Sequence, residues 1–504
     1  GALTSKPKAL VRIHMKKAGF NLKYFSFINA AEDSKYNKPD PRVFSKPIEK
    51  LKLEPKEILY IGDSIFDYIV AKKAGFKFIA VTTGYYTSKD FQKKGLKKQF
   101  ILPSLKGVEK MRYCLSGLAI VVFLAVSACH GAEESGALLS LPTPVKFKKT
   151  VLDTTFRSEG VAVADVNHDG KKDLLCGEVW YQGPDWKMHE ITKPGTYDGA
   201  KGYSQCFANF AASVRGNEWP DSLIVGFPSK EALWWENPRG KDVPWKRSVI
   251  SKNACNETPL FADLLGNGRP ILIYPDSECM TWFGVPKDPE QPWEKHIVST
   301  NKAPGTKTYS HGLGMGDVYG DGRNDILVKE GWWEAPVDRT ASPWQFHAAN
   351  FGPDCANIIV YDVNADGLPD VITSSAHQYG IWWFQQTRNG DKVEWKQNEI
   401  FAKLFSQSHA MVMADINGDK VNDIIVGKRF WAHGPKGDPD PDKPAVLYWM
   451  ELNRGEKGEV KWLPHLIDDN SGVGTQFEVT DINGDGKLDV AVSNKKGVCV
   501  CLQE

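Results

Sequence analysis

The chain contains the nine-residue stretch Asp165-Val-Asn167-His-Asp169-Gly170-Lys-Lys-Asp173, and four related stretches follow it in the 504-residue sequence. They begin at Asp317, Asp362, Asp415 and Asp481. Acidic or amide side chains occupy the first, third, fifth and ninth positions except at Tyr319, and most stretches have Gly at the sixth position. Loops of this kind supply the oxygen ligands that Ca²⁺ prefers, and Gly permits the sharp turn. The repetition predicts a calcium-binding repeat protein.

The predicted structural calcium ligands are the Asp and Asn side chains at the first, third, fifth and ninth positions of each stretch. Lys420 occupies the position of the turn Gly in the fourth stretch, so we expect a weaker site there. The ligand set is Asp165, Asn167, Asp169, Asp173, Asp317, Asp321, Asp325, Asp362, Asn364, Asp366, Asp370, Asp415, Asn417, Asp419, Asp423, Asp481, Asn483, Asp485 and Asp489.

Two weaker copies lie at 209–221 and 262–271, which makes seven repeats with a period of about fifty residues. Apolar alternating segments flank each loop, and an aromatic doublet such as Trp332-Trp333 follows in most repeats. Four short strands per repeat predict the blades of a seven-bladed β-propeller. We expect the doublets to pack between blades. An array of EF-hands is disfavoured because it requires flanking helices and Glu at the twelfth loop position.

Residues 145–504 therefore resemble the FG-GAP/VCBS propeller family. This resemblance implies a mainly β fold with calcium loops on one rim of the propeller. The propeller is also similar to that of aldos-2-ulose dehydratase, a sugar-processing enzyme whose cupin domains have no counterpart here. That similarity implies metal-assisted β-elimination from a keto-sugar.

A second set of residues stands six positions before the first loop Asp. Glu159, Glu257, His311 and His409 share this offset. Equal offsets in equivalent strands direct side chains the same way, so we expect these groups to converge at the mouth of the central channel. Histidines and carboxylates in one place suit a transition metal or acid–base chemistry. The alternative is a hydrated, inert channel mouth.

Two functions remain open on this basis. One is a binding module that presents its channel mouth to carbohydrate or to a surface protein. The other is a metal-dependent sugar lyase (dehydratase), with the metal on His311, His409 and Glu257 and with His377 or Lys428 as the base.

Residues 111–129 have a basic start, an apolar run and the ending Val126-Ser127-Ala128-Cys129. This pattern is typical of a secretion signal, and its ending resembles a bacterial lipobox. We expect cleavage before Cys129, lipid attachment to its thiol, a linker over 130–144 and a location in the cell envelope, periplasmic or on the outer surface. Residues 111–504 hold 40 basic and 52 acidic side chains, which argues against a nucleic-acid partner.

Residues 1–110 are basic, with 23 Lys and Arg against 10 Asp and Glu. The strand and acidic loop 57–67 together with Thr4 and Lys38 resemble the haloacid dehalogenase-like phosphatases. The resemblance implies that Thr4 and Lys38 bind phosphate and that Asp63 and Asp67 hold Mg²⁺ if this part folds. No D-x-D nucleophile motif precedes Thr4, so we expect a truncated, partial α/β (Rossmann-like) fragment without phosphatase activity.

Overall fold

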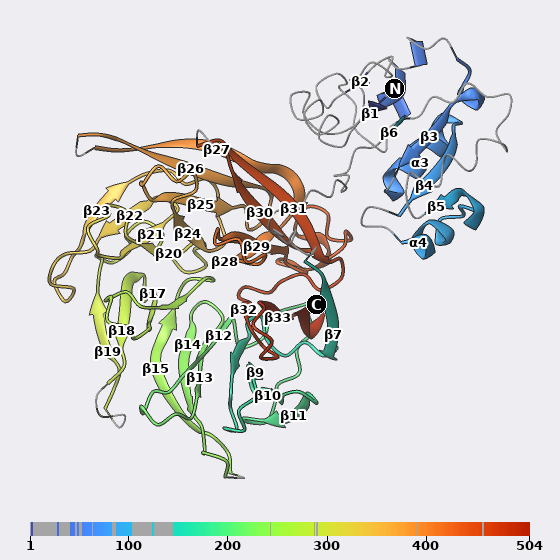
Figure 1. The fold of residues 1–504 in the computed structure, drawn as a ribbon. Helices are drawn as coiled ribbons and strands as arrows, with labels where there is room; N and C mark the ends of the chain where they lie inside the picture. Colours follow the sequence, from blue (N-terminus) through green and yellow to red (C-terminus); the bar gives the residue numbers. More distant parts are fainter. Residues whose placement is uncertain are drawn as a thin grey trace, which may run out of the picture. The chain divides into compact units, whose positions relative to one another are not determined.

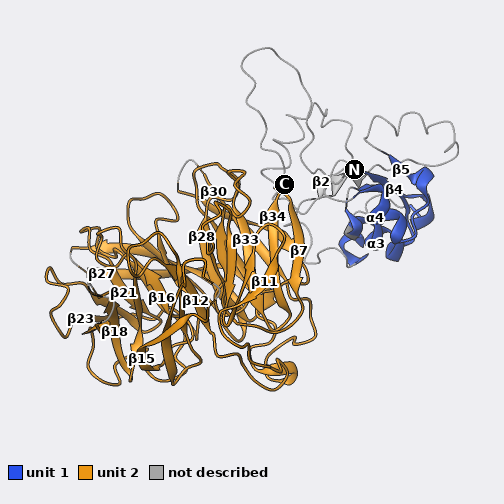
Figure 2. Ribbon diagram, turned by 90° about the horizontal axis from the view of Figure 1, so that it is seen from below, with its two compact units in different colours: residues 1–140 blue, residues 141–504 orange. Residues whose placement is uncertain are grey.

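The structure is a computed structural model that describes residues 2–3, 28–29, 41–45, 48–49, 53–62, 64–82, 87–102, 123–124 and 145–504, except 242, 287, 289–290, 391 and 456–457. The chain divides into two compact units, residues 1–140 and 141–504 (Figure 2). Within the described residues, every helix is too short or too polar to cross a membrane.

The first unit contains a parallel sheet with strand order β2-β1-β6-β3-β4-β5. Helix α3 follows β3 and begins at a capping box in which Ser64 and Asp67 bond to each other's backbone amides. The elements are β1 (Ala2–Leu3), β2 (Ile28–Asn29), η3 (Pro41–Phe44), η4 (Pro55–Glu57), β3 (Leu59–Gly62), α3 (Ile65–Ala74), β4 (Lys77–Val81), α4 (Ser88–Lys93), η5 (Lys98–Phe100), β5 (Ile101–Leu102) and β6 (Phe123–Leu124).

Strand β6 comes from the predicted signal segment, yet it pairs in parallel with both β1 and β3. An apolar pair of residues can fill a buried parallel strand as readily as it can fill a signal sequence. Of the predicted phosphatase residues, Asp67 is described, whereas Thr4, Lys38 and Asp63 lie outside the described residues. Cys129 and its lipobox lie outside them too.

The second unit contains three four-stranded sheets and two eight-stranded sheets, and each eight-stranded sheet joins two groups of four strands through a short contact. Its strands thus form seven antiparallel groups of four, six of which are built from strands consecutive in the sequence (Figure 1). We call these sheets 1 to 7. Two of their strands have 11 and 15 residues and the others are shorter, and the second strand of each sheet is wholly buried.

Sheets 1 to 3 contain β8 (Ala162–Ala164), β9 (Asp173–Cys176), β10 (Val179–Gln182), β11 (Lys187–Glu190); β12 (Ala208–Ala212), β13 (Asp221–Val225), β14 (Lys230–Glu236), β15 (Lys246–Ala254); and β16 (Leu260–Ala262), β17 (Ile271–Asp276), β18 (Cys279–Gly284), β19 (Glu294–Ile297).

Sheets 4 to 7 contain β20 (Gly314–Gly316), β21 (Asp325–Val328), β22 (Gly331–Glu334), β23 (Gln345–Ala348); β24 (Ile358–Tyr361), β25 (Asp370–Ser374), β26 (Tyr379–Asn389), β27 (Lys392–Ser406); β28 (Ser408–Ala414), β29 (Asp423–Lys428), β30 (Leu447–Arg454), β31 (Val460–Asp468); and β32 (Glu478–Thr480), β33 (Asp489–Asn494), β34 (Gly497–Gln503) with β7 (Phe147–Asp153). Helix η7 (Gly434–Lys436) lies in the connection between β29 and β30.

In five neighbouring pairs of sheets, the first strands contact each other. β8 contacts β12, β20 contacts β24, β24 contacts β28, β28 contacts β32, and β32 contacts β8. Gln476 and Glu478 of sheet 7 receive hydrogen bonds from the amides of Val161 and Val163 in sheet 1. The last sheet is therefore in contact with the first, and the sheets surround a common centre (Figure 1).

Sheet 7 combines both ends of the second unit, because β7 forms its outer strand and pairs antiparallel with β34. The aromatic doublets predicted to pack between sheets are buried, as Trp234, Trp332 and Trp333 illustrate. A histidine of the fourth strand stacks on the first Trp in four sheets. These stacked pairs are Trp180–His189, Trp282–His296, Trp332–His347 and Trp449–His465. All seven described cysteines are unbonded.

Candidate functional site

The predicted calcium loops connect the first and second strands of their sheets. In the first loop, Asp165 accepts hydrogen bonds from the backbone amides of Asp169 and Gly170 at 3.0 and 2.9 Å. The other four strong copies and the weaker copy at Asp263 repeat this pair of bonds. Lys420 adopts the left-handed conformation of the Gly that it replaces, with φ of 70°.

The ninth-position carboxylates serve a role that the motif did not reveal. Asp173 is buried, and its two oxygens accept the amides of Val166 and Gly183, each at 2.8 Å. The same carboxylate bridge ties the loop to the end of the third strand in five other sheets, through Asp221, Asp325, Asp370, Asp423 and Asp489. Burial raises the pKa of Asp173 to about 6 despite these amides.

Among the described residues, three carboxylates of one loop do not gather around a single point, whereas two groups that contain histidine do. Calcium binding in the loops would thus depend also on the Asn side chains and backbone carbonyls that the motif supplies. The two histidine groups lie elsewhere, at the predicted channel mouth.

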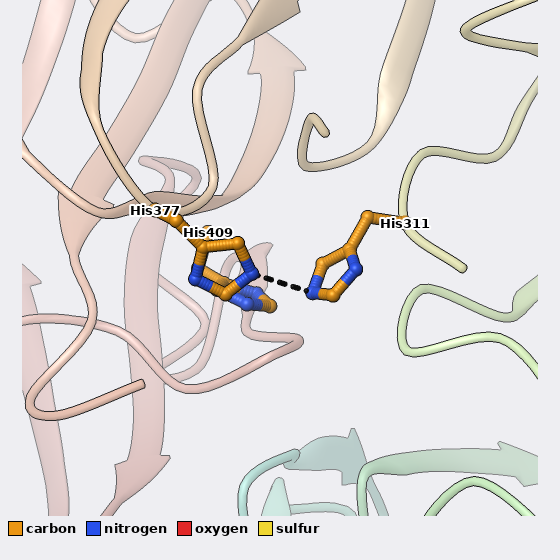
Figure 3. A group of neighbouring side chains, drawn as sticks. All are labelled: His311, His377 and His409. Atoms are coloured by element: carbon orange, nitrogen blue, oxygen red, sulfur yellow. Dashed lines mark hydrogen bonds between the residues drawn. The ribbon is translucent and has the colours of Figure 1, made fainter. Parts of the chain in front are cut away.

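Residues with the shared offset meet as predicted. His311 and Glu257 directly precede the first strands of their sheets, and His409 lies at the start of β28. His377 joins them from the turn between β25 and β26 (Figure 3). Glu159 enters the same cluster from the segment before β8. The other two residues at this offset, Ala356 and Thr475, are buried but contribute no ionisable group.

His311 organises one side of the cluster. Its Nδ1 donates to the carbonyl oxygen of Tyr309 at 2.9 Å, so Nε2 of the neutral ring can only accept a hydrogen bond. That Nε2 lies 3.0 Å from Nε2 of His377 and 3.4 Å from Oε2 of Glu257. Nε2 of His409 is 3.6 Å from the same carboxylate oxygen. The three imidazole rings are steeply inclined to one another, by 65° to 81°.

Arg429 organises the other side. Its guanidinium lies 3.2 Å from Oε2 of Glu257 and 3.3 Å from Oε2 of Glu159, and donates to Nε2 of His409 at 2.9 Å. All four side chains are at least nine-tenths buried. Lys495 adds a second cation 4.0 Å from Oε1 of Glu159. The cluster therefore pairs two buried carboxylates with two cations, as buried charges require.

These contacts shift the pKa values. Burial alone would raise the pKa of Glu257, but His311 and Arg429 outweigh it and lower this pKa to about 2. Burial and the Arg429 charge hold the pKa of His409 well below its usual range. Burial also lowers the pKa of Lys495 to about 8, although Glu159 opposes this. The cluster thus holds an ionised carboxylate beside a neutral imidazole.

Asp438 extends the cluster toward solvent. Its side chain is buried, and Oδ1 lies 3.0 Å from Nδ1 of His433 and 3.4 Å from Nδ1 of His377. The hydrogen bond that His433 donates to Asp438 raises the pKa of His433. His433 stacks on His377 at 4.5 Å between ring centroids and is half exposed. The connection from β29 to β30 therefore covers His377.

Glu257, His311, His377 and His409, which the sequence predicted as site residues, lie in this cluster. Lys428, the alternative base, is buried, and its Nζ donates to Ser406 Oγ at 2.8 Å. Asp438 and Lys495 were missed. Both lie in loops between the second and third strands of their sheets, as His377 does. Strand order could therefore have predicted that they lie on the same rim, but not that their side chains point toward the cluster.

The donor set fits a transition metal. Metal–nitrogen bonds of 2.0–2.1 Å place neighbouring tetrahedral donors about 3.3 Å apart, close to the 3.0 to 3.6 Å found between His311, His377, His409 and Glu257. His409 could use Nε2 for a metal only if the Arg429 hydrogen bond moved to another acceptor, and Glu159 and Glu257 are both within reach.

Two family models match parts of this chain. The model of haloacid dehalogenase-like hydrolases matches residues 1–81, and the model of FG-GAP-like repeats matches residues 362–426. The second match spans the loops that begin at Asp362 and Asp415. Both sequence resemblances are confirmed for these segments.

Among curated relatives, a phosphoglycolate phosphatase of Yersinia pestis is 35% identical over 85 residues, which are 17% of this chain and 36% of the relative. The chain thus spans about a third of the length of the curated relatives that it matches.

Two solved structures are similar to the larger unit. A lectin of Agrocybe aegerita that recognises non-reducing terminal N-acetylglucosamine is 16% identical, with a TM-score of 0.40, over 71% of this chain and 85% of the lectin. A rhamnogalacturonan lyase is 12% identical, with a TM-score of 0.38, over 70% of this chain and 75% of the lyase. TM-scores this low assign no ligand to this chain.

Proposed function

We propose that residues 145–504 form a closed seven-bladed β-propeller that is exported, lipid-anchored at Cys129 and stabilised by Ca²⁺, and whose channel mouth is a metal-dependent carbohydrate lyase site. One observation carries the catalytic part. Ring nitrogens of three imidazoles from three different sheets lie within 4.8 Å of one another, and a buried ionised carboxylate from a fourth sheet lies 3.4 and 3.6 Å from two of them. Structural histidines in this protein instead stack singly on Trp.

The seven sheets, their adjoining first strands and the contact of sheet 7 with sheet 1 support the propeller. The five loops with calcium-type sequences support the cation. The signal pattern of 111–129 supports export. A binding module is the less favoured alternative, because a site that only binds neutral sugar has no need of a neutral imidazole beside an ionised carboxylate.

A metal ion on His311, His409 and Glu257 would polarise a sugar carbonyl and acidify the adjacent C–H bond. With Nε2 of His311 on the metal, Nε2 of His377 would be released from its hydrogen bond with His311 and could accept that proton, and Asp438 on the far side of the ring would stabilise the resulting imidazolium. The electron pair released forms a C=C bond as the β C–O bond breaks. His377 then returns the proton to the leaving hydroxyl, which departs as water.

Metal counting on the full chain tests this proposal. The protein, kept in excess Ca²⁺, would be loaded separately with Zn²⁺ and Mn²⁺ and analysed by elemental mass spectrometry. We expect about one such ion per chain, and a loss of affinity of at least about tenfold in His311→Ala and His409→Ala. Turnover would be followed by the absorbance of the unsaturated product on a panel of 2-keto and 3-keto sugars.

The variant His465→Ala is the matched control. This histidine stacks on Trp449 from the fourth strand of sheet 6, whereas His409 of the cluster lies in the first strand of that sheet. We expect the substitution to change neither metal content nor turnover. His377→Ala separates the two roles open to this residue. Retained metal with lost turnover identifies a base, whereas lost metal identifies a fourth ligand. If His311→Ala leaves both metal content and turnover unchanged, the proposal is wrong.

A further inference from the structure

A second polar site lies between sheets 6 and 7, in a cleft of about 380 Å³. We call it the lysine cleft. Phe430 follows β29 and forms part of its wall, Lys495 and Lys496 come from the turn between β33 and β34, and Lys149 comes from β7. Val151, which also lines the cleft, is exposed, so the cleft reaches the surface beside it.

The charge on this lining is one-sided. The lining contains three lysines and no carboxylate, and Nζ of Lys495 lies 4.0 Å from Glu159 of the histidine cluster. Lys149 forms an ion pair with Asp468 at 2.9 Å, whereas Nζ of Lys496 lies 4.2 Å from the ring centroid of Phe430 and is also attracted by the charge of Asp468. Burial lowers the pKa of Lys496, and the charge of Lys149 lowers it further. Ammonium groups crowded in this way favour an anion between them.

A neutral donor completes the site. The hydroxyl of Ser471 is buried, lines the cleft and has no hydrogen-bond partner among the described residues. Asn494 fixes the two flanking segments, since its Nδ2 donates to the carbonyl of Ser471 and its Oδ1 accepts the amide of Lys496. A buried hydroxyl without a partner costs stability, and an acceptor on a ligand would remove that cost.

The cleft adjoins the channel mouth through Lys495. This side chain lines the cleft, while its Nζ lies 4.0 Å from Glu159 and 4.2 Å from the ring centroid of Tyr203. Glu159 in turn contacts Arg429 of the histidine cluster. Lys495 therefore belongs both to the lining of the cleft and to the charged cluster at the mouth.

We propose that the lysine cleft binds the carboxylate of an acidic sugar, so that the ligand of the channel mouth is an oligosaccharide that contains uronic acid. Lys149, Lys496 and Ser471 indicate that the ligand of the cleft is an anion. The inference that this anion belongs to a sugar rests on the function proposed above. Free sulfate or phosphate would share the anionic chemistry without the sugar.

Isothermal titration of the full chain with α-1,4-linked trigalacturonate and with neutral maltotriose tests the inference. Charge-assisted hydrogen bonds predict that trigalacturonate binds at least about tenfold more tightly than maltotriose, and that Lys496→Gln removes about this factor. Ser471→Ala should weaken trigalacturonate binding by a smaller factor. Lys461→Gln, an exposed lysine on β31, is the control and should bind as the unaltered protein does.

Lys496→Gln should melt at nearly the same temperature as the unaltered protein, because the lost contact with the Phe430 ring is offset by the lost repulsion from Lys149. This separates lost binding from lost folding. Equal binding of the two trisaccharides, or unchanged trigalacturonate binding in Lys496→Gln, would overturn the inference. If sodium sulfate binds with the same dependence on Lys496 but trigalacturonate does not bind, the inference of an acidic-sugar ligand is wrong and the cleft is a site for inorganic anions. The metal count of His409→Ala involves no cleft residue, so failure of the proposed lyase site would be recognised separately.

Discussion

Glu478 shows how one half-buried carboxylate makes stability depend on pH. It accepts the amide of Val163 across the contact between sheets 7 and 1, and burial raises its pKa to about 7. A raised carboxyl pKa means that the folded state binds the proton more tightly than the unfolded state does. The stabilisation is therefore complete below the unfolded pKa near 4.5 and is lost as the pH rises through about 7.

We expect Glu478→Gln to stabilise the second unit above pH 7 by about 1–2 kcal/mol, which corresponds to a rise in melting temperature of a few degrees. Gln keeps an acceptor for the Val163 amide and carries no charge. At pH 4.5 the two proteins should melt nearly together. Differential scanning calorimetry at pH 4.5, 6 and 8 measures this, and a gain that is independent of pH would contradict the explanation.

At the same scale, the sequence predicted which residues meet but not how they pair. A constant offset from a repeated loop was enough to bring Glu257, His311 and His409 together, because equivalent strands in a repeat direct equivalent side chains to one place. Arg429 has no such repeated counterpart among the offset residues. Its pairing with Glu159 depends on long side chains from non-equivalent positions, which strand periodicity does not determine.

At the scale of the loop and its two strands, the nine-residue motif has two separable parts. The first Asp closes the loop on its own amides, whereas the ninth ties the loop to the third strand. Sheet 2 demonstrates the separation, because it has Ser213 at the first position and still uses Asp221 to accept the amides of Val214 and Asn237. The survival of the ninth Asp without the first was visible in the sequence and indicates an architectural role.

The two parts predict different responses to calcium. Asp221→Ala would leave two buried amides unpaired, so we expect a loss of about 2–4 kcal/mol that is the same in Ca²⁺ and in EDTA. Asp366→Ala, in the loop that begins at Asp362, should destabilise mainly in Ca²⁺. EDTA should lower the melting temperature of the unaltered protein, since a ligand of the native state stabilises it. Thermal melts of the three proteins with and without Ca²⁺ decide this, and a melt unchanged by EDTA would exclude structural calcium.

At the scale of the whole molecule, the repeated apolar segments predicted a mainly β second unit, and its antiparallel strand pairing agrees. The first unit contains the parallel sheet expected of a partial α/β fragment. Strand β6 was expected within a signal sequence and lies in the parallel sheet beside β3. Apolar composition alone does not distinguish a segment that is inserted in a membrane from one that is buried in a sheet. The carboxyl group of Asp67, expected to bind Mg²⁺, accepts the hydroxyls of Tyr60 and Ser64.

The arrangement of sheet 7 makes a final prediction about closure. β7 is the outer strand of a sheet whose other strands lie more than 300 residues later, and Phe147 packs in the core shared with β34. Without β7, the outer edge of β34 would expose unpaired amides and carbonyls together with Cys499 and Cys501.

We therefore compare a variant that lacks residues 1–144, which retains β7, with one that lacks residues 1–154, which does not. The shorter protein should melt at least about 10 °C lower and aggregate, because it loses a strand's hydrogen bonds and core contacts. The variant that lacks residues 1–144 should melt at the same temperature as the second unit does within the full chain. Calorimetry and light scattering measure both properties. Equal melting temperatures would mean that the contact between sheets 7 and 1, rather than β7, closes the ring.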